Sequence, residues 1–134
     1  MRVLTLSVLA FAAAASMALV RVAQAQQPPQ VTRYGYWPLE GDSSREVRLL
    51  TVVVPPGGST PFHTHAGDQW EMIQEGALTF AIKGQPPKVL RIGDVIYIPR
   101  GTVHRNQNLT DKPARTVELT IADKNSPARE VVNN

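Results

Sequence analysis

The chain has 134 residues, 14 basic and 11 acidic side chains, a formal net charge of +3 and no cysteine. This length suits one domain of ordinary size, and the lack of cysteine excludes disulfide frameworks and thiolate chemistry. No cluster of lysine and arginine is interleaved with aromatic residues, so we expect no nucleic acid partner.

Residues 1–25 have the layout of a secretory signal peptide. Arg2 precedes an apolar stretch over residues 3–20, and Ala23-Gln24-Ala25 forms a cleavage site of the A-x-A type. The alternative is an uncleaved membrane anchor, because a helix over the apolar stretch would span roughly 27 Å of a hydrocarbon core of about 30 Å. The alanine-rich composition favours cleavage. Cleavage would leave a periplasmic or secreted protein with no stable membrane span, and its net charge would fall to +1 because Arg2 and Arg21 are removed.

The rest of the chain predicts short strands between two loose ends. Residues 26–30 (QQPPQ) indicate a linker, residues 31–122 one domain, and residues 123–134 a loosely held tail. Within the domain, apolar or alternating runs are separated by glycine and proline turns and recur about every 8 to 12 residues, with no amphipathic helix. The expected strands are EVRLLTVVV at 46–54, WEMIQ at 70–74, ALTFAI at 77–82, KVLRI at 88–92, VIYI at 95–98, and the alternating run at 116–121. This spacing predicts an all-β antiparallel sandwich or barrel.

The three histidines have a spacing that suits a metal site. His63 and His65 are two residues apart, so on a strand their side chains point the same way, roughly 6.6 Å apart. Residues 66–68 then allow the chain to turn back, so that Gln69 begins a neighbouring strand beside them. His104 follows a second strand and a turn. Spacing therefore allows three imidazoles and one amide to face a single point.

These residues carry two motifs by which the chain resembles the cupin superfamily. The first motif, G-x5-H-x-H-x3-E-x6-G, is matched at Gly57, His63, His65 and Gly76, with Gln69 in the place of the glutamate. The second, G-x5-P-x-G-x2-H-x3-N, is matched in full at Gly93, Pro99, Gly101, His104 and Asn108. The resemblance covers residues 31–122 and is that of a small single-domain cupin of the secreted bacterial kind.

The resemblance implies a fold, a metal and a partner. The fold would be a cupin-type jelly-roll antiparallel β-barrel that holds one divalent transition metal, Fe, Mn, Cu, Ni or Zn. Carried over position by position, the ligands would be His63, His65, Gln69 and His104, at the usual 2.0 to 2.2 Å or so. The family also suggests a small-molecule substrate or ligand in the barrel and a homodimer that pairs through an outer sheet face.

Gln69 is the departure from the family pattern, because an amide oxygen is neutral and a weaker donor than a carboxylate. A site of three histidines and one glutamine would leave the ion its full charge, and it would polarise a bound water or substrate more strongly. Three outcomes stay open: the amide coordinates, it turns away and leaves a three-histidine site, or the site is empty.

Glu71 lies two positions after Gln69, on the same face of the same strand. It would replace the missing carboxylate as a ligand, act as the catalytic proton acceptor beside the metal, or be a solvated residue at the rim.

Two functions of different class follow. The first is a mononuclear metalloenzyme, dioxygenase-like, that acts on a small oxygenated substrate, with lyase and isomerase reactions as other possibilities. The second is a non-catalytic periplasmic module that binds a metal or a small ligand.

Overall fold

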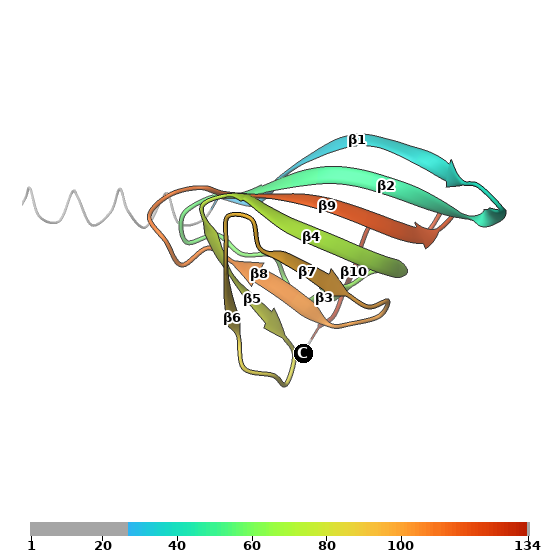
Figure 1. The fold of residues 1–134 in the computed structure, drawn as a ribbon. Coiled ribbons are helices and arrows are strands. Elements are labelled where there is room, and N and C mark those ends of the chain that lie inside the picture. The colour runs from blue at the N-terminus through green and yellow to red at the C-terminus, as the bar shows by residue number, and fades with distance from the viewer. Residues whose placement is uncertain (1–26, 134) are drawn as a thin grey trace, which may run out of the picture.

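The computed structural model describes residues 27–133, where every regular element is a β-strand and ten strands form two antiparallel sheets (Figure 1). The predicted signal peptide lies outside the described residues. No helix able to cross a membrane occurs within residues 27–133. The large sheet has the order β1 (Gln30–Leu39), β2 (Asp42–Val54), β9 (Ala114–Asp123), β4 (Gly67–Glu75) and β7 (Val95–Ile98). The small sheet has the order β10 (Glu130–Val131), β3 (His63–Thr64), β8 (His104–Gln107), β5 (Ala77–Ile82) and β6 (Lys88–Arg91).

The predicted all-β class is confirmed, as a pair of facing sheets that share no hydrogen-bonded strand. β2 pairs with β9 from Arg45–Asp123 to Val54–Ala114, and this long ladder forms the middle of the large sheet together with β4. The sequence pattern did not predict β1, which pairs with β2 and begins at Gln30, inside the expected linker.

The layer between the sheets changes from apolar to polar along the strands. One end is filled by a hydrophobic core of Val52, Val54, Ile73, Leu78, Phe80, Leu90, Ile98 and Ala114. Toward the other end of the same strands, the inward positions carry Arg48 on β2, Gln69 and Glu71 on β4, and Glu118 on β9, all of them buried. Polar side chains are buried only where partners or ligands compensate the lost water. This end therefore holds the candidate site.

Two glycines fix the ends of β4. A Cβ at Gly67 would lie 2.1 Å from the carbonyl oxygen of Ile121, so only glycine permits β4 to start this close to β9. Gly76 has a φ of 71° and turns the chain from β4 into β5, a backbone conformation that glycine adopts without strain. Together they set where the inward residues of β4 lie.

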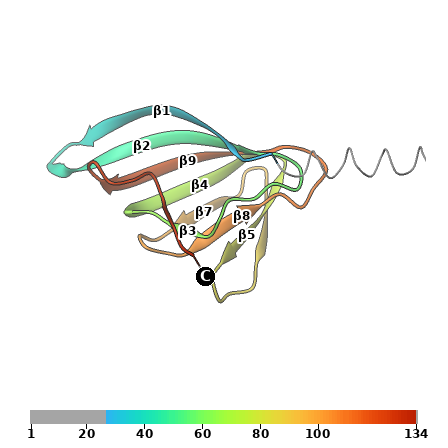
Figure 2. The ribbon, with the colours of Figure 1, turned by 180° about the vertical axis from the view of Figure 1, so that it is seen from behind.

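The C-terminal residues do not form the loose tail that the sequence suggests. Residues 124–132, here called the strap, cross from the end of β9 in the large sheet to β3 in the small sheet (Figure 2). The buried guanidinium of Arg48 donates hydrogen bonds to the carbonyl oxygens of Asp123, Ser126 and Pro127 at 2.9 to 3.1 Å. β10 then pairs with β3, and the N–H of Val132 donates to the carbonyl oxygen of Phe62 at 2.8 Å. The strap is thus attached at both ends.

Candidate metal centre

The three histidines come from two neighbouring strands of the small sheet and meet at one point. His63 on β3 is the register partner of His104 on β8, and His65 follows one residue after the end of β3. Their ring centroids are 4.4 to 5.3 Å apart. One potential ligand atom from each histidine lies within 4.8 Å of the others, and no further such group occurs among residues 27–133. The structure therefore brings the three predicted histidines together.

The main chain fixes the ring orientation of each histidine. The Nδ1 atoms of His63, His65 and His104 lie 2.7 to 2.9 Å from the carbonyl oxygens of Pro61, Ala128 and Thr102, respectively. Because a carbonyl only accepts, each Nδ1 carries the proton and each Nε2 keeps its lone pair. The Nε2 of His65 is buried and has no hydrogen-bond partner among the described residues. A neutral imidazole held in this way is the form that binds metal ions.

Burial keeps the imidazoles neutral. Loss of water lowers the pKa of His63 to about 3 and that of His65 to about 4, and it also lowers the pKa of His104. The hydrogen bonds to backbone carbonyls act in the opposite direction, but they are outweighed. Protons therefore compete weakly with a metal ion for these nitrogens at neutral pH.

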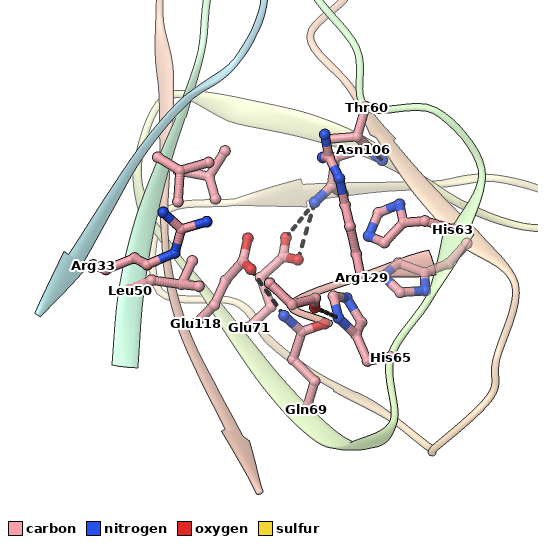
Figure 3. Close-up of a pocket in the computed structure, with 14 residues that line it drawn as sticks. Arg33, Leu50, Thr60, His63, His65, Gln69, Glu71, Asn106, Glu118 and Arg129 are labelled. Carbon is pink, nitrogen blue, oxygen red and sulfur yellow. Dashed lines mark hydrogen bonds between the residues drawn. The ribbon is translucent and has the colours of Figure 1, made fainter. Parts of the chain in front are cut away.

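Gln69 is buried beside this cluster in the same cavity, with 1% of its surface exposed. Its Nε2 donates a hydrogen bond of 2.8 Å to Glu118, while its Oε1 is buried without a partner among the described residues (Figure 3). A buried amide oxygen without a donor is costly unless a ligand satisfies it. The unpartnered atoms Nε2 of His65 and Oε1 of Gln69 are both metal-ligand types, so the residues present fit a divalent transition ion.

Glu71 is not a solvated rim residue, because only 1% of its surface is exposed. Both of its carboxylate oxygens accept from Nδ2 of Asn106 at 2.9 Å, and it does not belong to the cluster of potential ligand atoms. Glu71 therefore lines the same cavity as the histidines without belonging to their cluster, and the interpretation of Glu71 as a replacement ligand is not supported.

Glu71 and Glu118 form a buried acid pair on adjacent strands. They are register partners in the β4–β9 ladder, and both face inward. Burial, together with the neighbouring carboxylate of Glu118, raises the pKa of Glu71 to about 8, and burial raises the pKa of Glu118 to about 7. The pair therefore holds at least one proton near neutral pH, which makes it a proton donor and acceptor next to the histidines.

The sequence pattern missed Glu118 and Asn106. On β9 the valine, leucine and isoleucine of the alternating run face outward, and Thr116, Glu118 and Thr120 are the buried face. Alternation alone predicts a strand but not which face is inside. The signal available for Asn106 was its position two residues after His104 on the same strand, hence on the same face.

The residues surround a cavity of about 220 Å³. At about 30 Å³ per water molecule, this corresponds to roughly seven waters, which suits a small ligand. The small sheet contributes the histidines and Asn106, and the large sheet contributes Gln69, Glu71 and Glu118. The other residues that line the cavity are Val31, Arg33, Leu50, Val52, Thr60, Ala128 and Arg129.

Comparison with known proteins shows the family to which this chain belongs. The model of a family described as Cupin domain matches residues 50–120, more than half of the chain. The auxin-binding protein ABP19b of Prunus persica is 30% identical over 92 residues, which cover 65% of this chain and 43% of that protein. The dimethylsulfoniopropionate lyase DddQ of Ruegeria pomeroyi is 30% identical over 81 residues, which cover 60% of this chain and 40% of that protein. The chain thus spans about two fifths of the length of these relatives.

Solved structures agree with this assignment. The crystal structure of DddQ from Ruegeria pomeroyi aligns with a TM-score of 0.60 at 25% identity, over 75% of this chain and 52% of that chain. Oxalate oxidase in complex with the substrate analogue glycolate aligns with a TM-score of 0.63 at 24% identity, over 81% of this chain and 58% of that chain. These likenesses confirm the predicted cupin-type jelly roll.

Proposed function

We propose that this chain, which belongs to the cupin domain family, is a metal-dependent enzyme that acts on a small oxygenated molecule. One observation carries the proposal: three neutral imidazoles, each fixed through Nδ1 by a backbone carbonyl, converge in a cavity with a buried acid pair. A structural role alone would not require two buried histidines beside a half-buried one, an unpartnered amide oxygen and two buried carboxyls in one place.

His63, His65 and His104 would hold the ion, with the Oε1 of Gln69 as the fourth protein donor. A bound divalent transition ion, Fe, Mn, Cu, Ni or Zn, would supply Lewis-acid polarisation of a substrate oxygen or redox chemistry with dioxygen. Glu118 holds the Gln69 amide through Nε2, which leaves the oxygen atom for the ion.

The acid pair would move the proton. Asn106 fixes both oxygens of Glu71, and Glu118 is held by the Gln69 amide and the Thr116 hydroxyl at 2.8 and 2.9 Å. One carboxyl of the pair donates or accepts a proton at the substrate while the other remains in its hydrogen bonds. The buried position excludes bulk water from that exchange.

Two reaction classes fit this site, each favoured by one observation. The set of three imidazole nitrogens suits redox-active iron or copper and favours a dioxygenase-like reaction. The proton-holding acid pair, and the 30% identity with a lyase, favour proton abstraction followed by elimination or isomerisation. Oxygen uptake in the presence of substrate distinguishes the two classes, because only the first consumes dioxygen.

The test begins with metal analysis of protein purified without a histidine tag, followed by turnover assays on small carboxylic acids, diketones and thiols with and without oxygen. Glu71→Gln is expected to keep the metal content and to lower turnover at least about 100-fold, since general acid–base catalysis contributes about that much or more. Glu75→Gln is the matched control, because Glu75 is exposed on the same strand.

Turnover that survives Glu71→Gln would contradict the role given to Glu71. A wild-type protein that binds metal and turns over none of the substrates would support the non-catalytic binding module instead.

The surroundings of the protein are part of the proposal. The signal-like segment over residues 1–25 supports export to the periplasm or the medium.

The exposed side chains Trp70, Met72, Val95, Tyr97 and Leu119, here called the outer face, are brought together by the β9–β4–β7 register. An apolar sheet face of this kind supports a homodimer.

A further inference from the structure

Arg129 has a fixed backbone position at the cavity. The carbonyl of the preceding residue, Ala128, accepts from Nδ1 of His65 at 2.7 Å, and the following residue, Glu130, pairs with Thr64 on β3. Both neighbours are thus attached to the segment that carries His63 and His65. Arg129 lines the cavity, so the fold sets its backbone position relative to the histidines, while its side chain is largely exposed.

The charge of Arg129 is not used elsewhere in the described residues. It takes part in no ion pair or hydrogen bond within residues 27–133, whereas other arginines have carboxylate partners. Those pairs are Arg45–Asp68, Arg48–Glu46, Arg100–Asp123 and Arg115–Glu75. The guanidinium is nevertheless close enough to lower the pKa values of His63, His65 and Glu118. Its field therefore reaches both the histidines and the acid pair.

Arg33 is a second unpaired arginine of the cavity. It comes from β1 in the large sheet, on the side of Leu50 and Glu118, while Arg129 comes from the strap (Figure 3). The two guanidinium groups thus reach one cavity from different segments. Both side chains are largely exposed, and neither has a carboxylate partner within residues 27–133.

A guanidinium presents a planar fork of N–H donors that matches a carboxylate. The cavity volume of about 220 Å³ corresponds to roughly seven water molecules, so it suits a ligand of about that many non-hydrogen atoms. We propose that Arg129, assisted by Arg33, binds the carboxylate of a small hydroxy or oxo acid, whose second oxygen group faces the three histidines. This inference rests on the proposed function, because it names the substrate class of the same site.

Isothermal titration with matched acid and amide pairs, glycolate with glycolamide and lactate with lactamide, tests the inference. Zinc-loaded and metal-free protein are both titrated, and metal content is measured in every sample. The wild type is expected to bind each acid at least about tenfold more tightly than its amide, which is typical of a charge-assisted hydrogen bond. Arg129→Gln is expected to lose this preference at unchanged metal content, and Arg33→Gln to lose part of it.

Arg91→Gln is the control, because Arg91 is exposed and does not line the cavity. Arg129→Lys keeps the charge without the fork and is expected to retain an intermediate preference. Equal binding of acid and amide by the wild type, or an acid preference that survives in Arg129→Gln, would overturn the inference.

The two proposals fail in different ways. A wild type that takes up no metal contradicts the proposed function. The preference for acids in the metal-free protein then still decides whether the arginine site exists. A wild type that takes up metal and shows no acid preference contradicts only the substrate class.

Discussion

At position 69 this chain has an amide where the cupin motif has an acid. The acid of this site is Glu118, which accepts a hydrogen bond from the amide of Gln69. The Nε2 of Gln69 donates to Glu118, and this bond decides which atom of the amide is left unpaired. A carboxylate that forms a hydrogen bond with a metal ligand typically changes the metal affinity by fixing the orientation of that ligand. Glu118 is therefore a positioning residue for Gln69.

Replacing Glu118 tests this role. Glu118→Leu removes the acceptor of the amide hydrogen bond. We expect metal affinity to fall about 10- to 100-fold, which is typical when a residue that holds a metal ligand is removed. Glu118→Gln keeps an acceptor oxygen and is expected to stay near the wild type. The measurement is a competition titration against a chelator. Equal affinities of Glu118→Leu and the wild type would show that the amide does not need this support.

The same polar groups predict how the stability of the metal-free protein depends on pH. The pKa values of His63 and His65 fall from 6.5 in the unfolded chain to about 3 and 4 in the fold, so the unfolded state binds more protons and stability is lost as pH falls below 6.5. The pKa values of Glu71 and Glu118 rise from 4.5 to about 8 and 7, so the folded state binds more protons and stability is lost as pH rises from 4.5 through 8.

We therefore expect greatest stability around pH 5 to 6, where the two effects balance. Denaturant midpoints measured with a chelator between pH 4 and 9 give the profile. The double variant Glu71→Gln with Glu118→Gln is expected to lose less stability between pH 6 and 8 than the wild type. Parallel profiles in that range would contradict the assignment of the alkaline loss to the acid pair.

At the level of elements, the strap connects the C-terminal residues to the site. Ala128 supplies the carbonyl that holds Nδ1 of His65, and Arg48 holds the start of the strap from β2. The strap is therefore part of the candidate metal centre, although none of the four predicted metal ligands belongs to it.

Removal of the strap is the matching prediction. Deletion of residues 127–134 takes away the acceptor of His65, and we expect metal affinity to fall at least about tenfold, together with a lower melting temperature. Deletion of residues 133–134 alone is the control, because all of the strap contacts are kept. Unchanged metal affinity in the longer deletion would show that the ring of His65 is held by other contacts.

Local patterns predicted the elements that depend on local information. The β-branched run of β2, the alternation in β5 and the glycine turns between strands indicated an all-β protein, and the histidine spacing placed three imidazoles together. The two-residue strand β10 has no pattern of its own, because it exists only through pairing with β3. On β9 the apolar residues of the alternating run face outward, and Glu118 faces inward, where it lines the cavity. Such features depend on contacts between distant segments.

At the scale of the molecule, the outer face of the large sheet is apolar while much of its inner face is polar. The rings of Trp70 and Tyr97 lie 5.3 Å apart on this face, and Leu119 is the register partner of Trp70 on β9. Nearby, Arg100 pairs with Asp123, and Arg45 lies close to Asp68. An apolar centre with charged groups beside it is typical of a protein interface.

Leu119→Arg tests the proposed homodimer, because a charge within the outer face cannot be buried in an interface without a partner. The wild type is expected to run as a dimer in size-exclusion chromatography with light scattering, and the variant as a folded monomer. Leu109→Arg is the control, since Leu109 is exposed in a loop outside this face. A monomeric wild type at micromolar concentration would contradict the proposal.

The carbonyl contacts at the histidine rings have a consequence for how a metal ion would enter the proposed site. Because Pro61, Thr102 and Ala128 hold the rings through the main chain, an ion can arrive or leave without refolding of the polypeptide. A preformed nitrogen face has little means of rejecting one first-row ion in favour of another. The occupant should then follow the abundance of free ions in the compartment where the protein folds, weighted by the Irving–Williams order of affinities. Expression in media of different metal content should yield protein of correspondingly different composition.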